Sequence, residues 1–130
     1  MVHATAFYAA LMGFFIVYMG RRVAYCRRDN QIGIGGNDHP ELGVLIRAHG
    51  NAVENIPITL LLMALAELNG ASGFLLHLYG IVLVASRIAH AHGFIESKGR
   101  AHPARLYGTM GNWLLIAALG AHNILLVWFG

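Results

Sequence analysis

The chain has 130 residues, of which 57% are hydrophobic and only 12% are charged, and its net charge is +3. A soluble domain normally carries about twice this charged fraction, so the composition excludes an ordinary soluble globular domain. The basic residues lie beside long apolar runs, which favours a membrane protein over a nucleic-acid binder, and the single cysteine, Cys26, excludes an intrachain disulfide.

Four apolar segments follow one another in a single domain that covers residues 1–130. They occupy about residues 3–20, 42–68, 74–93 and 107–129, and each is close to the roughly 20 residues that cross a bilayer. Lipid offers no partner to open backbone groups, so we expect every segment to be helical. The first segment has no basic residue before it and no clear cleavage site after it, which predicts a retained span rather than a signal peptide. The predicted fold is an all-α integral membrane bundle of four transmembrane helices.

The basic residues between the segments predict the orientation of the bundle. The first connection contains four arginines and the third contains Lys98, Arg100 and Arg105, whereas the turn between the second and third segments contains no basic residue. Positively charged connections stay on the cytoplasmic side of a membrane. We therefore expect the first and third connections in the cytoplasm and both termini outside.

Polar side chains interrupt the second apolar segment. Arg47, Asn51 and Glu54 follow helical spacing, so we expect them to share one face of the second helix. His49 and Asn55 flank this face. Charged residues inside a membrane usually face the interior of a bundle or a wet cavity.

The third helix repeats this design, because Arg87 and His90 share one of its faces. We expect Arg87 to pair with Glu54, since an unpaired charge in this position would be costly. Two interpretations fit these residues: an ion-pair network that holds four helices together, or a polar pocket that opens toward the cytoplasm. Such a pocket would suit a small anion with carboxylates, to which arginine forms forked hydrogen bonds.

The eight histidines of the chain do not predict a metal site. His90 and His92 are two residues apart and point to different faces of a helix, and the sequence has neither a second cysteine nor an HExxH pattern.

Small and polar residues predict how the fourth segment packs. We expect Gly108, Gly111 and Gly120 to let helices approach closely. We expect His122 and Asn123 to form hydrogen bonds between helices rather than to bind a ligand.

The stretch RAHGNAVENIP resembles a motif of the MAPEG family, the membrane-associated proteins of eicosanoid and glutathione metabolism. The family pattern on the second helix is an Arg-Ala pair, then Asn, Glu and Pro, and it is matched here by Arg47, Ala48, Asn51, Glu54 and Pro57. Arg87 matches an arginine of the family's third helix, and the length and four-span layout also agree. The resemblance is to short bacterial inner-membrane members, although Asn55, His90 and Phe94 stand where many eukaryotic members have tyrosines.

The resemblance implies a homotrimer in the bacterial inner membrane, with glutathione bound between neighbouring protomers near the cytoplasmic side. In the family, glutathione contacts polar residues of the second helix and arginines at the end of the first. The residues expected to bind glutathione are Arg21, Arg22, Arg47, His49, Asn51, Glu54, Asn55, Arg87 and His90.

The resemblance also implies an activity, that of a glutathione transferase or peroxidase acting on hydrophobic electrophiles or lipid hydroperoxides from the bilayer. Family enzymes stabilise the glutathione thiolate with an arginine at the start of the fourth helix, for which Arg105 is the best match and Arg100 the second. A nearby guanidinium favours the thiolate and lowers the pKa of the thiol from its usual value of about 8.5.

Two other hypotheses fit the sequence. The chain could be a small four-helix transporter in which Glu54 is a proton-coupled carboxylate, although a permanent cation beside Glu54 would argue against this. Alternatively, it could be a non-catalytic membrane scaffold in which the polar residues only specify assembly.

Overall fold

The computed structural model describes residues 1–36 and 38–130, and these form four long helices. They are α1 (His3–Asp29), α2 (Pro40–Leu68), α3 (Gly73–Glu96) and α4 (Pro103–Phe129). All four are long and apolar enough to cross a membrane, which confirms the predicted all-α integral membrane fold. Asn37, in the first predicted connection, lies outside the described residues.

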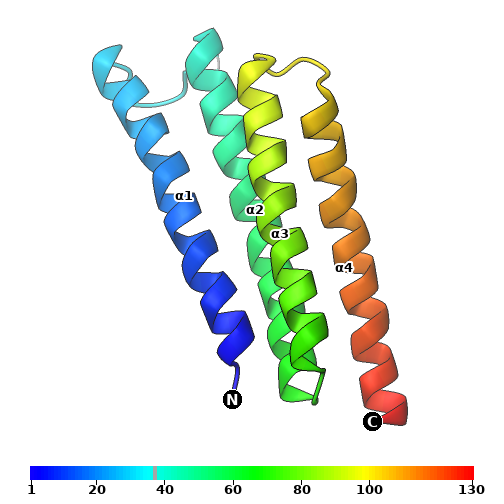
Figure 1. The fold of residues 1–130 in the computed structure, drawn as a ribbon. Helices are drawn as coiled ribbons and strands as arrows, with labels where there is room; N and C mark the ends of the chain where they lie inside the picture. The colour runs from blue at the N-terminus through cyan, green and yellow to red at the C-terminus, as the bar shows by residue number, and fades with distance from the viewer. Residues whose placement is uncertain (37) are drawn as a thin grey trace.

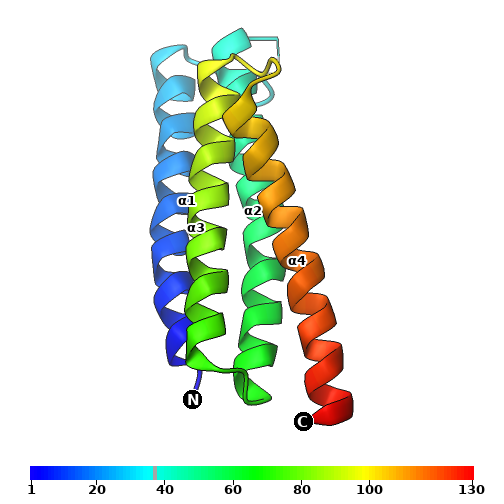
Figure 2. The ribbon, with the colours of Figure 1, turned by 45° about the vertical axis from the view of Figure 1, so that its right-hand side comes forward.

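The helices run up and down in an antiparallel bundle (Figure 1). The connections α1–α2 and α3–α4 lie at one end, which we call the basic end because it carries most of the basic residues. Both termini and the short α2–α3 turn lie at the other end. Helices α2 and α3 pack on each other, and each also packs on α1 and α4. Helix α4 leans away from the other helices toward its C-terminus (Figure 2).

Helix α1 continues beyond the predicted end of its apolar segment at residue 20, as far as Asp29. A helix of 27 residues is about 40 Å long, whereas the hydrocarbon core of a bilayer is about 30 Å thick. The arginines predicted to lie in a connection are therefore on the last turns of α1, which extend past the hydrocarbon region.

The beginning of each helix has a defined hydrogen-bond acceptor. A side chain at the N-cap accepts from a first-turn amide in three helices: His39 for α2, Ser72 for α3 and His102 for α4. Helix α1 has no such side chain of its own. Instead, the carboxylate of Glu67, near the end of α2, accepts from the backbone nitrogens of Ala4 at 2.9 Å and Thr5 at 2.8 Å. The missing cap of α1 is thus supplied by a neighbouring helix.

Most of the predicted contacts of α4 are present. Asn123 donates to the backbone oxygen of Leu62 at 2.9 Å, and His122 is hydrogen-bonded to Tyr79 at 3.1 Å. Gly108 and Gly111 pack closely on α3, but Gly120 has no atom within 4 Å of the place where a Cβ would lie. The prediction of close packing is therefore wrong for Gly120, because the adjacent Leu119, which is completely buried, is the residue that faces the bundle at this level.

Candidate functional site

Arg87 of α3 is a buried charge at the centre of a polar network. Its side chain is 2% exposed. It donates to Oδ1 of Asn51 on α2 at 3.0 Å and to the backbone oxygen of Gly108 on α4 at 2.8 Å. Among the described residues, its Nε has no partner and no carboxylate forms an ion pair with it. A buried cation that lacks a counter-ion favours the approach of an anion.

Two further asparagines extend this network from α2 to α4. Asn55 donates to the backbone oxygen of Asn51 at 2.9 Å and accepts from Asn112 at 3.1 Å. Asn112 is completely buried. We call Asn51, Asn55, Arg87, Gly108 and Asn112 the polar network. Asn112 was not predicted as a site residue, although a lone asparagine before the apolar run WLLIAAL indicates a buried polar side chain.

The expected ion pair between Glu54 and Arg87 is absent from the part of the chain that the structure describes. Glu54 lies instead 3.4 Å from Arg47, two turns earlier on the same face of α2, and both side chains are more than half exposed. Arg87 points into the bundle, where Asn51 and the carbonyl of Gly108 are closer partners. The prediction was wrong because the spacing of residues does not show which of two adjacent faces of α2 meets α3.

His90, Phe94 and Arg105 form a stack beside the polar network. The buried ring of His90 stacks on Phe94 with ring centroids 5.9 Å apart, and the guanidinium of Arg105 lies 4.5 Å from the centre of the same phenyl ring. Arg105 also donates to the backbone oxygens of Gly99 at 2.8 Å and Arg100 at 3.1 Å. Arg105 of α4 is therefore joined to His90 of α3 through the ring of Phe94.

Glycines allow α4 to lie close to α3 at this level. A Cβ added to Gly93 would come within 2.5 Å of the backbone nitrogen of Arg105, and one added to Gly108 would come within 2.5 Å of the backbone nitrogen of His90. The close approach brings the carbonyl of Gly108 within reach of Arg87. It also places the first turn of α4, with Arg105, against the end of α3.

The arginines of α1 lie apart from the polar network. Arg21 is exposed and donates to the hydroxyl of Tyr25 at 2.7 Å. Arg22 lines a cavity between α1, α2 and α3. His49 of α2 lies against α1, since its Nε2 is 3.4 Å from the Cβ position of Gly20. Of the predicted glutathione-binding residues, Arg22 and His49 therefore lie where α1 meets α2, and Arg21 faces outward from α1.

Arg100 differs from Arg105 in the exposure and the hydrogen-bond partners of its guanidinium. Its side chain is exposed in the α3–α4 connection, and within residues 1–36 and 38–130 its hydrogen bonds involve only its backbone atoms. Arg105 is half-buried and its guanidinium already has two backbone partners. Of these two arginines, Arg100 is therefore the one whose guanidinium is available to a ligand.

The arrangement suits the binding of a small molecule with several anionic groups. Guanidinium groups bind carboxylates in forked geometry, and hydrogen bonds to ionised groups are stronger than those between neutral groups. A thiol held near these cations would ionise more readily, because an adjacent positive charge stabilises the thiolate.

Comparisons with known proteins agree with this arrangement of helices and polar residues. The sequence matches the family model of the MAPEG family over residues 5–125. It is 40% identical to the inner membrane protein YecN of Escherichia coli strain K12 over 120 residues, and this aligned region covers 92% of this chain and 89% of the relative. The protein of the same name from Escherichia coli O6:H1 has the same identity and coverage.

Proposed function

Because the chain belongs to the MAPEG family, we propose that it is a glutathione-dependent transferase or peroxidase of the bacterial inner membrane. Family membership supports a membrane function related to glutathione. The inner-membrane location is supported by four helices of spanning length and by the relative that is named an inner membrane protein. The transferase or peroxidase activity is our inference from the site.

The buried guanidinium of Arg87 is the observation that carries this proposal. It is hydrogen-bonded to Asn51, which lies one turn from both Arg47 and Glu54 on α2, and it has no carboxylate partner among the described residues. Glutathione has two carboxylates, one ammonium and one thiol. Arg47 can bind a carboxylate, Glu54 can accept from the ammonium, and Asn51, which lies between them on α2, is hydrogen-bonded to the buried cation.

The outward position of Arg47 and Glu54 supports assembly into a homotrimer. Both side chains are more than half exposed on a helix of membrane-spanning length, and exposure of such charges to lipid is costly. A neighbouring protomer would cover them and enclose the ligand. Arg21 is the better candidate to reach across this interface, because it points outward, whereas Arg22 lines a cavity within its own protomer.

The proposed chemistry starts from the glutathione thiolate. In conjugation, the thiolate sulfur forms a bond to an electrophilic carbon of a hydrophobic substrate, which loses a leaving group or opens a strained ring. In peroxide reduction, two glutathione molecules and one hydroperoxide give a disulfide, an alcohol and water. The protein lowers the pKa of the thiol with a guanidinium, and we propose Arg100 ahead of Arg105 because its guanidinium has no partner among the described residues.

The pairing of Glu54 disfavours the transporter hypothesis. Its carboxylate already has a permanent cation 3.4 Å away as its partner, and a proton-coupled carboxylate works best without one.

Thiolate formation can be tested directly with the purified protein. Glutathione is added to the parent protein and to Arg100→Ala, Arg105→Ala and Arg28→Ala, and the ultraviolet difference band of the thiolate is recorded. Binding of S-methylglutathione, which cannot ionise at sulfur, is measured in parallel. Arg28 is the matched control, because it lies at the same end of the bundle and is exposed beside Asp29.

We expect the band in the parent and in Arg28→Ala, and its loss in Arg100→Ala with S-methylglutathione binding retained. Loss only in Arg105→Ala would move the thiolate-stabilising role to Arg105. A parent protein that binds neither compound would refute the proposed function and would favour the scaffold hypothesis.

A further inference from the structure

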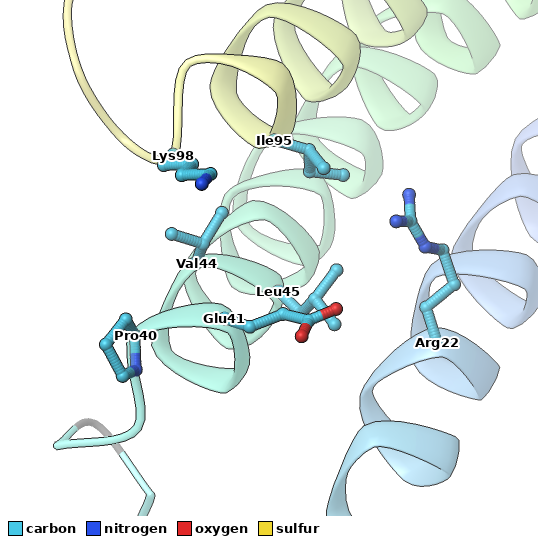
Figure 3. A pocket seen from close by; sticks show the side chains of 7 residues that line it. All are labelled: Arg22, Pro40, Glu41, Val44, Leu45, Ile95 and Lys98. Carbon is cyan, nitrogen blue, oxygen red and sulfur yellow. The ribbon is translucent and has the colours of Figure 1, made fainter.

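We propose that the cavity between α1, α2 and α3 binds a phospholipid whose headgroup carries both a phosphate and a primary ammonium. The cavity has a volume of about 320 Å³ and lies at the basic end (Figure 3). Its lining residues are Arg22, Pro40, Glu41, Val44, Leu45, Ile95 and Lys98. None of them belongs to the polar network or to the stack of His90, Phe94 and Arg105, so the proposal does not rest on the proposed function.

The charges of the cavity fit a zwitterionic headgroup. Arg22 enters from α1, Glu41 from the first turn of α2, and Lys98 from the end of α3 (Figure 3). In the described part of the chain, no ion pair within 4.0 Å joins Glu41 to either cation. Two cations suit a phosphate and one carboxylate suits an ammonium that donates hydrogen bonds.

The backbone at Lys98 supports a role for this side chain. Lys98 has a φ of 52°, a left-handed conformation that glycine or asparagine adopts at lower cost than lysine. The next residue, Gly99, also has a positive φ of 81°. The chain therefore turns sharply at the end of α3 with a lysine in a position where glycine is easier to place, and its side chain lines the cavity.

A groove between α1 and α3 continues from the cavity toward the middle of the membrane. The groove has a volume of about 390 Å³ and shares Arg22 and Ile95 with the cavity. The apolar residues that line it include Phe15, Met19, Ile88 and Ala91. From Arg22 to Phe15 is two helical turns, or about 10 Å, which is enough to hold the upper part of an acyl chain.

A third hollow opens from the cavity in the opposite direction. It shares Arg22, Glu41 and Leu45 with the cavity and is lined otherwise by Tyr25, Cys26, Asp29 and Asn30. The groove also holds the paired side chains of His92 and Glu96 near the end of α3. Apolar side chains therefore lie at the far end of the path, charged side chains line the cavity, and polar side chains line the opening. A lipid has the same order of chemistry, whereas a water-soluble zwitterion has no part that would fill the groove.

Lipid binding can be measured by native mass spectrometry of the protein in detergent, with phosphatidylethanolamine, phosphatidylglycerol and phosphatidylcholine as probes. We expect phosphatidylethanolamine to bind at least about tenfold more tightly than the other two, because only its headgroup combines phosphate with a hydrogen-bonding ammonium. Glycerophosphoethanolamine, which has the same headgroup without acyl chains, distinguishes a lipid from a soluble phosphate ester.

Three variants test the assignment of charges. Arg22→Gln and Lys98→Gln should weaken binding of all three lipids, whereas Glu41→Gln should remove the preference for phosphatidylethanolamine over phosphatidylglycerol. Arg28→Gln is the control and should change neither. Circular dichroism and thermal unfolding of the same preparations show that each variant is folded.

Two results would overturn the proposal. The first is equal affinity of the parent for all three lipids, which would mean that the headgroup is not recognised. The second is binding of glycerophosphoethanolamine as tight as that of the lipid, which would identify the cavity as a site for a soluble phosphate ester. Neither result would alter the thiolate measurement, so failure of the two proposals can be told apart.

Discussion

Gly108 of α4 lies directly on the backbone of His90 in α3. A Cβ added to Gly108 would come within 2.5 Å of the His90 nitrogen and within 2.6 Å of the Ser86 oxygen. These are backbone atoms in the middle of a helix, so they cannot move aside as the end of a flexible side chain can. The hydrogen bond from Arg87 to the carbonyl of Gly108, at 2.8 Å, depends on this contact.

We therefore expect Gly108→Ala to force α3 and α4 apart. The free energy of unfolding should fall by about 1 to 3 kcal/mol, as for other insertions into packed interiors. Gly120→Ala is the matched control on the same helix, because nothing lies within 4 Å of its Cβ position and alanine favours a helix over glycine by up to about 1 kcal/mol. Thermal unfolding in detergent compares the two. Equal stability of the two variants would contradict the close packing at Gly108.

Replacing Asn51 with aspartate would give the buried cation a carboxylate partner. Because Oδ1 of Asn51 lies 3.0 Å from Nη1 of Arg87, Asn51→Asp converts a hydrogen bond into an ion pair. We expect the free energy of unfolding to rise by about 1 kcal/mol, since the stronger contact is partly offset by desolvation of the carboxylate. Glutathione affinity should fall at least about tenfold, because the site loses its attraction for an external anion.

Asn55→Asp is the control for this substitution. It makes the same chemical change one turn away, where the neighbours are Asn112 and the backbone oxygen of Asn51 rather than a cation. This variant should be destabilised, because a carboxylate cannot donate to that oxygen. Melting curves with and without glutathione separate the two effects. An unchanged glutathione affinity in Asn51→Asp would show that Arg87 plays no part in binding.

The sequence predicted the helices of this protein better than their mutual contacts. Apolar runs of spanning length form helices in lipid whatever their neighbours are, so the four spans could be predicted from the length and position of these runs. The partner of Arg87 did not follow, because it depends on the rotation of α3 relative to α2. Arg87 takes one partner from α2 and one from α4, so the rotation that favours Asn51 and Gly108 over Glu54 depends on three helices and is not encoded by any single segment.

The different positions of Arg21 and Arg22 could be seen only in the structure. Arg21 and Arg22 are adjacent in the sequence and equally basic, and the family resemblance did not distinguish between them. On a helix, adjacent residues point about 100° apart. One therefore faces outward beside Tyr25, and the other lines the cavity within the protomer.

Removal of the Glu67 carboxylate should expose the beginning of α1. The carboxylate accepts from the backbone nitrogens of Ala4 and Thr5, and loss of an N-terminal cap usually costs about 0.5 to 2 kcal/mol. We expect Glu67→Ala to accelerate hydrogen exchange at these two amides and to lower the free energy of unfolding by a similar amount. Glu96→Ala, which removes an exposed carboxylate paired with His92, should change stability by less than about 1 kcal/mol. Unchanged exchange at Ala4 and Thr5 would show that Glu67 does not cap α1.

The orientation of the bundle can be tested with two engineered cysteines. The positive-inside rule predicts that the basic end lies in the cytoplasm. In a Cys26→Ser background, Asp38→Cys places a thiol in the α1–α2 connection and Ser72→Cys places one in the α2–α3 turn, and both positions are exposed. A membrane-impermeant maleimide should label Ser72→Cys from outside, in cells whose outer membrane alone has been opened. It should label Asp38→Cys only after the inner membrane is permeabilised as well. The reverse pattern would place the candidate glutathione site on the outer side, away from a cytoplasmic thiol, and would contradict both the predicted orientation and the proposed source of glutathione.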